Sequence, residues 1–282
     1  MSGRLFVVAT PIGNLSDVTL RALETLRDVP LIAAEDTRLT HRLLARHGIA
    51  TRTISYHARS GPGRLAELLA HLRDGADLAL VTDAGTPSVS DPGEDLVAAW
   101  ASEGGTVVPI PGASAVTALV AASGLAGPRW AFEGFLPRSG RERRERLARI
   151  AADDRGTVLY EAPGRVAATL VDLAAACGAE RPAAVGRELT KLHEEIVRGT
   201  LGALAERARS GELTLRGEFA IVVGSRPEGT TQAATRDADP AEALAEVERL
   251  VATGTPRGEA ARQVAAATGI PRRRLYAAPV DR

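Results

Sequence analysis

The sequence predicts an α/β fold made of two α/β domains, followed by a small helical module. In the first half of the chain, short apolar runs alternate with amphipathic segments, which indicates a mostly parallel sheet covered by helices. In the second half, two strand-like runs stand only three residues apart, which favours a hairpin and a mixed sheet. With 282 residues, 45% of them hydrophobic, the chain can bury a core in each domain.

Five strands and four helices are expected in the first half. The strands are expected at 4–9, 30–35, near 51–55, and at 77–82 and 106–110. A helix follows each of the first four strands. Ser16 is expected to cap the first helix, and Gly48 to end the second. The other two helices are expected near 63–73 and 93–103.

The second half is expected to form the mixed sheet. Its strand-like runs are 129–134, 156–161, 183–189, 193–199 and 218–224. Residues 225–240 contain no large apolar side chain, which is typical of a linker. The expected parts are therefore a first α/β domain, a second α/β domain, a linker and a tail resembling a helix-turn-helix, at 1–115, 116–224, 225–240 and 241–282.

Composition excludes several classes of protein. The single cysteine, Cys177, cannot build a disulfide framework or a cysteine metal site, and we expect no bound metal. No run approaches the eighteen apolar residues of a membrane span and no signal peptide is evident, so we expect a soluble cytoplasmic protein. Arginine supplies all but one of the 35 basic residues, and the only lysine is Lys191.

The stretch LVTDAGTPSVSDPG, residues 80–93, places acidic, glycine and proline residues at the end of a buried strand. In open α/β sheets, ligands bind beyond the carboxyl ends of the strands. The sequence lacks the phosphate-binding patterns GxxxxGK[ST] and GxGxxG, and Asp83 would repel a phosphate. A cationic ligand with ribose hydroxyls suits the loop better, and Gly85 would let the backbone come close. S-adenosylmethionine has both features; a plain surface turn is the alternative.

A second loop, PGASAV at 111–116, directly follows an expected strand. Gly112 and its small neighbours leave backbone N–H groups accessible at the start of a helix, which suits the carboxylate of the same ligand. An ordinary strand-to-helix turn capped by Ser114 is the alternative.

Two further segments combine several polar groups. AEDTR, which contains Glu35 and Arg38, follows a strand, and RELTKLHEE, which contains Glu188 and Lys191, lies beside the expected hairpin. The pKa of a lysine shifts readily on burial, so a lysine kept in an arginine-rich chain indicates a chemical role. A solvated hairpin turn is the alternative.

Seven segments, in this order, resemble the ribosomal RNA small subunit methyltransferase I family, a branch of the tetrapyrrole-methylase-like class III methyltransferases. They cover about residues 4–224 and read VATPIGNLSDVTLRAL, AAEDTR, LVTDAGTPSVSDPG, PIPGASAVTAL, FEGFLPR, YEAPGR and RELTKLHEE. The loop TPIGN is similar to the ribosomal RNA branch, whereas corrin and porphyrin methylases carry a glycine-rich loop there. The chain departs from the family's pattern at Ala58-Arg59, where Asn-Glu is common.

The resemblance implies S-adenosylmethionine in a cleft between two α/β domains, and 2′-O-methylation of a cytidine in the decoding region of 16S ribosomal RNA. It also implies a homodimer that acts on the small ribosomal subunit. The candidate catalytic residues are Lys191, Glu188 and Glu35: a carboxylate would accept the hydroxyl proton and Lys191 would stabilise developing charge. The candidate cofactor contacts are Pro11, Thr82, Asp83, Ala84, Gly85, Thr86, Gly112, Ala113 and Ser114.

Positive charge for RNA is expected on segment 138–149, RSGRERRERLAR, which has six arginines and two glutamates. A solvated helix with Glu–Arg pairs is the alternative. The candidate RNA contacts are Arg38, His57, Arg141, Arg143, Arg144 and Arg146. Two other functions stay open: a corrin or porphyrin methyltransferase, and a DNA-binding regulator that acts through the tail. We expect neither DNA nor a membrane as the main partner.

Overall fold

A computed structural model describes residues 2–226, 240–268 and 270–276 of the protein. The chain divides into two compact units, Met1–Arg226 and Pro227–Arg282. Nearly all of the linker expected at 225–240 lies outside the described residues. Within the described residues, no helix is long and apolar enough to cross a membrane.

The first unit begins with a five-stranded parallel sheet of order β3-β2-β4-β1-β5. Its strands are β1 (Arg4–Val8), β2 (Leu31–Ala34), β3 (Thr53–Ser55), β4 (Leu78–Val81) and β5 (Thr106–Ile110). All five expected strands are therefore present, and because they run parallel, the loops that follow them meet at one edge of the sheet.

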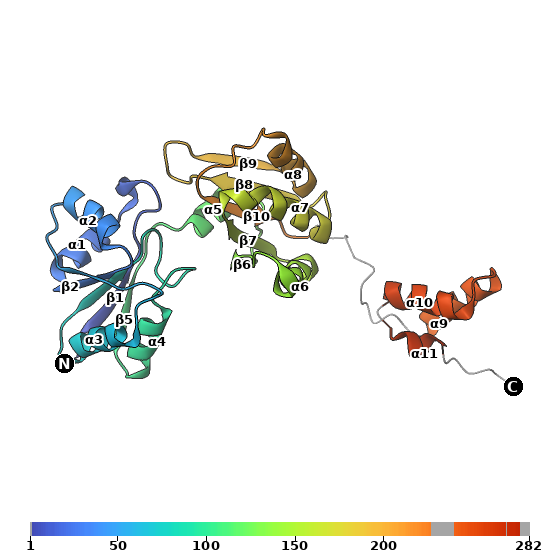
Figure 1. The fold of residues 1–282 in the computed structure, drawn as a ribbon, viewed down its shortest axis with the longest axis horizontal. Helices are drawn as coiled ribbons and strands as arrows, with labels where there is room; N and C mark the ends of the chain where they lie inside the picture. The colour runs from blue at the N-terminus through green and yellow to red at the C-terminus, as the bar shows by residue number, and fades with distance from the viewer. Residues whose placement is uncertain (1, 227–239, 269, 277–282) are drawn as a thin grey trace. The chain divides into compact units, whose positions relative to one another are not determined.

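Helices cover both faces of this sheet (Figure 1). They are α1 (Leu20–Asp28), α2 (Thr37–Arg46), α3 (Pro62–Arg73) and α4 (Glu94–Ser102). Successive strand residues point to opposite faces. Ala79 and Val81 of β4 thus pack with α1 and α2, whereas Leu78 and Leu80 pack with α3 and α4. The alternation explains why the central strands β2 and β4 are apolar along their whole length.

The start of α1 corrects the sequence prediction. Residues Leu15–Asp17 form a separate 3₁₀ turn, and the α-helix begins only at Leu20. Its cap is Thr19, whose Oγ1 accepts a hydrogen bond from Ala22 N at 3.1 Å. Ser16 therefore does not cap the helix; its backbone N–H donates instead to Asn14 Oδ1. Gly48 ends α2 as expected, with φ +63°.

The second sheet of the same unit has order β6-β7-β10-β8-β9. Its strands are β6 (Trp130–Phe135), β7 (Gly156–Glu161), β8 (Pro182–Arg187), β9 (Glu195–Thr200) and β10 (Phe219–Val223). Strands β6 and β7 are parallel, and the remaining pairs are antiparallel. The mixed sheet expected from the sequence is confirmed.

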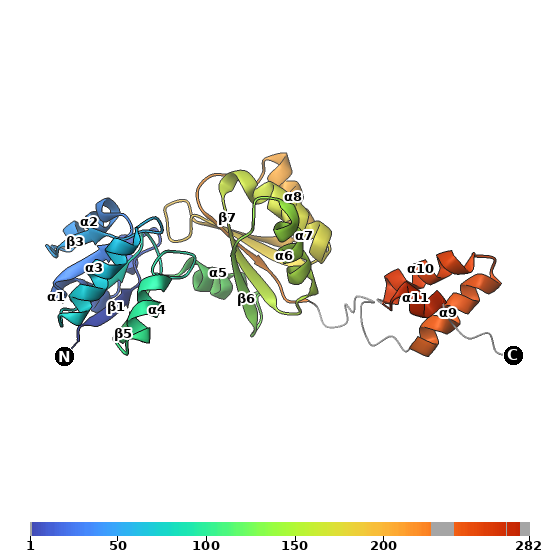
Figure 2. The ribbon, with the colours of Figure 1, turned by 60° about the horizontal axis from the view of Figure 1, so that its bottom comes forward.

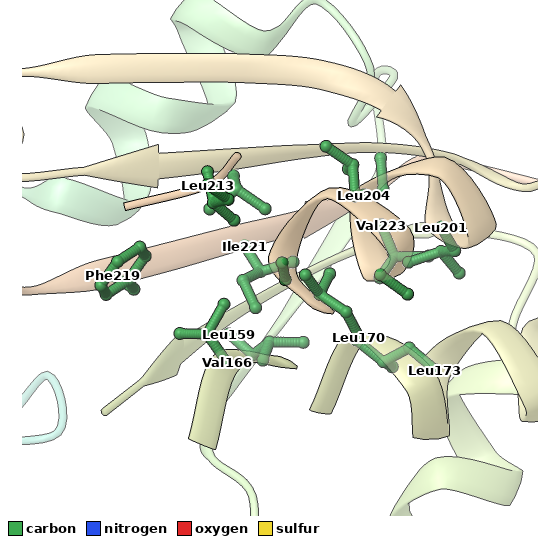
Figure 3. Packing of buried hydrophobic residues seen from close by; sticks show 14 of the residues in the cluster. Leu159, Val166, Leu170, Leu173, Leu201, Leu204, Leu213, Phe219, Ile221 and Val223 are labelled. Atoms are coloured by element: carbon green, nitrogen blue, oxygen red, sulfur yellow. The ribbon is translucent and has the colours of Figure 1, made fainter. Parts of the chain in front are cut away.

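One face of the second sheet is covered by α6 (Gly140–Ala152), α7 (Val166–Cys177) and α8 (Leu201–Ser210), as Figure 2 shows. Figure 3 shows leucines of α7 and α8 packed against β7 and β10. The opposite face carries α5 (Ala115–Ser123). Ile12, Ala84 and Ala113, from loops of the first sheet, join that second cluster, so apolar packing connects the two halves of the unit.

The β8–β9 hairpin is wider than predicted. The strands end at Arg187 and resume at Glu195, rather than at 189 and 193. Glu188 and Thr190 have φ of +49° and +65°, which an extended strand cannot contain. The resulting loop holds Lys191 away from the strand pairing.

The second unit contains α9 (Pro240–Ala252), α10 (Arg257–Thr268) and α11 (Arg272–Tyr276) around a small core that includes Val247, Val264 and Leu275. Two or three short helices were expected here. The exposed arginines 272–274 lie on the last of them.

Candidate functional site

The loops after β1 and β4 are fastened to each other at the carboxyl edge of the first sheet. Thr10 N donates to Gly85 O at 2.8 Å, and Gly85 N donates to Thr10 O at 3.1 Å. The Thr10 hydroxyl adds a bond of 3.1 Å to Thr82 O. Along the second loop, φ is positive at Gly85, Ser88, Ser90 and Gly93. Positive φ is costly for serine, and such strain is typical of functional loops.

Beside these loops lies a cavity of about 340 Å³, here called the central cavity. Both halves of the first unit contribute to its walls. The residues from the first half are Ile12, Ala84, Gly85, Thr86, Val89, Ser90, Asp91, Ser114 and Ala115. Those from the second half are Phe135, Tyr160, Glu161, Ala162, Pro163, Leu189, Gly217, Glu218, Phe219 and Ala220. The volume and the apolar walls suit a small organic ligand.

Two lining residues of the central cavity, Asp91 and Tyr160, have shifted pKa values. Burial, followed by the charges of Glu35 and Asp83, raises the pKa of Asp91 to about 7. Burial and the charge of Asp91 raise the pKa of Tyr160 to about 12. The ring of Tyr160 contacts Phe135, with centroids 5.6 Å apart. The cavity thus combines a carboxylate that titrates near neutrality with an aromatic wall.

Asp83, a predicted cofactor contact, is not among the residues that line the central cavity. Its Oδ1 accepts a hydrogen bond of 2.9 Å from Asp36 N, while Glu35 Oε2 accepts one of 3.2 Å from Asp83 N. Asp83 therefore ties the loop after β4 to the loop after β2. From the same loop, the carboxylate that lines the cavity is Asp91, eight residues further along; Glu161 and Glu218 line it from the second half.

The other predicted cofactor contacts divide into three groups. Ala84, Gly85, Thr86 and Ser114 line the central cavity. Gly112 and Ala113 line an adjacent cavity of about 400 Å³, which Ser114 also borders. Pro11 and Thr82 are buried and line none of these cavities. Ser114 stands at the N-cap of α5 without a capping side-chain bond, so its hydroxyl is available to a ligand.

Sequence reasoning missed most of the residues that line the central cavity, among them Ser90, Asp91, Phe135 and Tyr160. These four lie in the segments SVSDPG, FEGFLPR and YEAPGR, which already carried the family resemblance. An aromatic residue beside a strand end is an available signal for a binding wall.

Lys191 is held by two carboxylates. Its Nζ lies 2.9 Å from Glu188 Oε1 and 3.0 Å from Glu218 Oε2. Burial lowers the pKa of Lys191, but the hydrogen bonds to Glu188 and Glu218 outweigh it, so the pKa is raised overall. The Lys191 bond, followed by the backbone bond from Glu218, lowers the pKa of Glu188. A side chain at Gly13 would collide with Lys191, so this glycine lets the lysine lie against the loop after β1.

The predicted RNA contacts Arg38 and His57 lie close to Glu35 and Asp36. Arg38 is exposed and forms a 2.6 Å ion pair with Asp36. His57 is exposed and its charge acts on the pKa of Glu35, which burial raises. Loops after β2 and β3 thus place a cation and an imidazole at the edge of the sheet.

Segment 138–149 forms α6, and the structure corrects part of its predicted role. The Arg143 guanidinium is buried and binds Asp172, the Pro137 carbonyl and the Thr169 hydroxyl. A buried guanidinium cannot contact a phosphate at the surface, so the assignment of Arg143 to RNA is wrong. Arg146 is likewise engaged, with Glu133 and the carbonyls of residues 133 and 135. Arg141 and Arg144 are exposed.

Replacing Asp91 by asparagine should stabilise the free protein increasingly as the pH rises. The folded pKa of Asp91, about 7, exceeds its ordinary value of 3.8, so the folded state holds a proton that the unfolded chain has lost. The contribution of Asp91 to the free energy of unfolding is therefore at its maximum below pH 4 and is lost as the pH rises to 7. Asparagine does not titrate, so this loss is absent in the variant. We expect the free energy of unfolding of Asp91→Asn to exceed that of the wild type by about 1–2 kcal/mol at pH 8, after allowing for solvent screening.

Urea unfolding at pH 5 and pH 8 checks this expectation. The matched control is Asp74→Asn, because Asp74 is exposed at the end of α3. Parallel stability profiles for wild type and Asp91→Asn across this range would show that the cavity imposes no cost on the carboxylate.

A family model places the chain among the methylases. It belongs to the family of tetrapyrrole (corrin/porphyrin) methylases, whose family model matches residues 4–205. The structure is similar to cobalt precorrin-4 methyltransferase, with a TM-score of 0.61 and 19% identity over 78% of this chain and 94% of the other. It is also similar to Thermus thermophilus uroporphyrin-III C-methyltransferase complexed with S-adenosylhomocysteine, with a TM-score of 0.57 and 21% identity over 79% and 97%. At these identities, the likeness concerns the fold alone.

Closer sequence relatives define the branch. Ribosomal RNA small subunit methyltransferase I of Synechocystis sp. is 49% identical, over 97% of this chain and 96% of the relative. The enzyme of the same name from Xylella fastidiosa is 42% identical, over 97% and 98%. Within the methylases, the chain therefore belongs to the ribosomal RNA small subunit methyltransferase I family, which confirms the resemblance seen in the sequence.

Proposed function

We propose that this protein transfers a methyl group from S-adenosylmethionine to the ribose 2′-hydroxyl of a cytidine in the decoding region of 16S ribosomal RNA. The observation that carries the proposal is sequence identity of 40–49%, over nearly the full chain, with relatives named ribosomal RNA small subunit methyltransferase I. The central cavity supports it, because its chemistry suits the cofactor.

The residues of the central cavity fit S-adenosylmethionine. A volume of about 340 Å³ lies within the range of small-molecule sites. Asp91 would accept hydrogen bonds from ribose hydroxyls and attract the sulfonium, and Phe135 with Tyr160 would cover the adenine. Ser114, at the start of α5, would bind the carboxylate. Once bound, the cofactor supplies a methyl group activated by its positive sulfur.

We assign the stabilisation of developing negative charge to Lys191, which is held between Glu188 and Glu218. A ribose hydroxyl gains negative charge during reaction, and a fixed ammonium stabilises that charge. The lowered pKa of Glu188 makes it a weak base, so its role is to position Lys191. Glu35, whose pKa burial raises, is the better proton acceptor of the predicted catalytic set.

RNA contacts are proposed for Arg38, His57, Arg141 and Arg144, which are all exposed. We propose further that residues 1–115 and 116–224 act as the two domains that hold the cofactor. The protein would work in the cytoplasm as a homodimer on the small ribosomal subunit, as the family resemblance implies. A mass measurement in solution tests the dimer.

Two rival functions have less support. A corrin or porphyrin methyltransferase is opposed by the TPIGN loop and by the relatives at 40–49% identity. A DNA-binding regulator rests on the helical second unit alone, and such a shape does not establish a function.

Methylation of 16S ribosomal RNA tests the proposal. Small subunits and naked 16S RNA from cells lacking this gene are incubated with protein and labelled S-adenosylmethionine. We expect about one methyl group per RNA, mapped by mass spectrometry to the 2′-oxygen of a decoding-region cytidine. Methylation of a base atom, or of a tetrapyrrole in place of RNA, would contradict the proposal.

A further inference from the structure

A second cavity, of about 600 Å³, lies on the other side of the loops that border the central cavity. We call it the Arg46 cavity. Consecutive residues face the two spaces: Ile12 and Leu189 line the central cavity, whereas Gly13, Thr190 and Lys191 line the Arg46 cavity. Because neighbouring α-carbons are about 3.8 Å apart, only a thin wall of backbone separates the two.

The lining of the Arg46 cavity suits an anion. Its polar groups come from the loop after β1, the end of α2 and the β8–β9 loop, and none of its described lining residues is acidic. These groups are Asn14, Ser16, Arg46, His47, Thr190 and Lys191. Lys191 is already paired with Glu188 and Glu218, whereas no described residue forms an ion pair with Arg46. The charge available to a ligand is therefore that of Arg46.

Two buried polar atoms of the lining residues also lack a partner. Neither His47 Nε2 nor Thr190 Oγ1 has a hydrogen bond to any described residue. A buried polar atom without a partner costs free energy, and native structures contain few of them. Thr190 is moreover held at φ +65°, an uncommon conformation for a β-branched residue. A hydroxyl from the β8–β9 loop, with an imidazole and a guanidinium from the end of α2, together match the oxygens of a phosphate group.

We propose that the Arg46 cavity binds a phosphodiester of the RNA next to the nucleotide that receives the methyl group. The inference rests on the proposed function, because it takes RNA as the substrate. Arg46 would pair with the phosphate, while Thr190 and His47 donate hydrogen bonds. Binding there would hold the target ribose beside Lys191, on the wall between the cavities, and would leave the cofactor's own contacts unchanged.

The test compares Arg46→Ala with Arg42→Ala, an exposed arginine one turn earlier on α2 that lines neither cavity. Filter binding uses the form of unmethylated 16S RNA, naked or within small subunits, that the wild type methylates. We expect Arg46→Ala to weaken RNA binding about tenfold and to reduce the slope of log K against log salt by about 0.7, the value for one phosphate of a single strand. Thr190→Val should weaken binding several-fold with the slope unchanged.

Calorimetry with S-adenosylhomocysteine should give wild-type affinity for all three variants, which shows that they are folded. Wild-type RNA affinity and salt slope in Arg46→Ala, with the wild type itself active on RNA, would overturn the phosphate site and leave the proposed function intact. If the wild type neither binds nor methylates ribosomal RNA, the proposed function fails, and the phosphate site fails with it.

Discussion

Lys191→Ala should lower the single-turnover methylation rate about 100- to 1,000-fold at saturating cofactor and RNA, as loss of one fixed charge-stabilising group does in other enzymes. The ammonium is fixed in advance by Glu188 and Glu218, at 2.9 and 3.0 Å, and by its contact with Gly13. Because its pKa is raised, it carries its charge at neutral pH. Cofactor and RNA affinities should change little, since the interaction forms mainly in the transition state.

Two further variants, Lys191→Arg and Glu188→Gln, separate the role of Lys191 from that of Glu188. Lys191→Arg should recover only part of the rate, because a planar guanidinium cannot take the place of a compact ammonium between two carboxylates. Glu188→Gln should lower the rate about tenfold if Glu188 only positions the lysine. Should Glu188→Gln instead lose as much as Lys191→Ala, with the acidic limb of the pH profile removed, Glu188 would be the base. Wild-type rates in both Lys191→Ala and Glu188→Gln would leave substrate alignment as the sole source of catalysis.

Local sequence patterns were sufficient to predict the strands and the edge at which the site lies. Strands such as β4 are apolar on both faces because helices cover both, and this pattern is legible in a single sequence. Parallel strands then oblige their following loops to meet, which brought Gly85 and Ser114 to one cavity without any tertiary information.

Local sequence patterns could not show that Asp91, rather than Asp83, lines the central cavity. Asp83 and Asp91 stand in one loop, and both follow the same strand. Between them the backbone reverses through positive φ values at Gly85, Ser88 and Ser90. Serine does not signal such a conformation, because its side chain ordinarily avoids it. Loop geometry therefore places Asp91 rather than Asp83 on the central cavity, and a cofactor contact at Asp83 stays a prediction.

The error at Arg143 had a signal in the sequence. Leu147 and Ile150, both buried, follow it at helical spacings of four and seven residues. A residue in that register lies on the buried stripe of the helix, whatever its charge. Periodicity thus separates Arg143 from Arg141 and Arg144, which a count of arginines in segment 138–149 could not do.

Arg143→Ala should destabilise the first unit by about 2–4 kcal/mol, because the buried arginine side chain leaves a gap, its ion pair with Asp172 is lost and the buried Thr169 hydroxyl loses its donor. The Arg143 side chain is 9% exposed, and its guanidinium reaches Asp172, Thr169 and the Pro137 carbonyl. Thr169 in turn donates to the buried Glu161 at 2.6 Å. Because Glu161 lines the central cavity, the loss of these hydrogen bonds should also disturb the wall of that cavity. Both tryptophans of the chain, Trp100 and Trp130, lie in this unit, and their fluorescence in urea measures its unfolding.

Arg141→Ala is the matched control on the same helix. Its side chain is 86% exposed and forms a single pair with Glu145 at spacing i,i+4, for which we expect a loss below about 0.5 kcal/mol. Arg143→Lys should retain part of the stability, because an ammonium can reach one of the three partners but not all of them. The RNA affinity of folded Arg143→Ala should equal that of the wild type in conditions where both are stable. Normal stability combined with weakened RNA binding in Arg143→Ala would reverse this assignment and restore the arginine to the RNA surface.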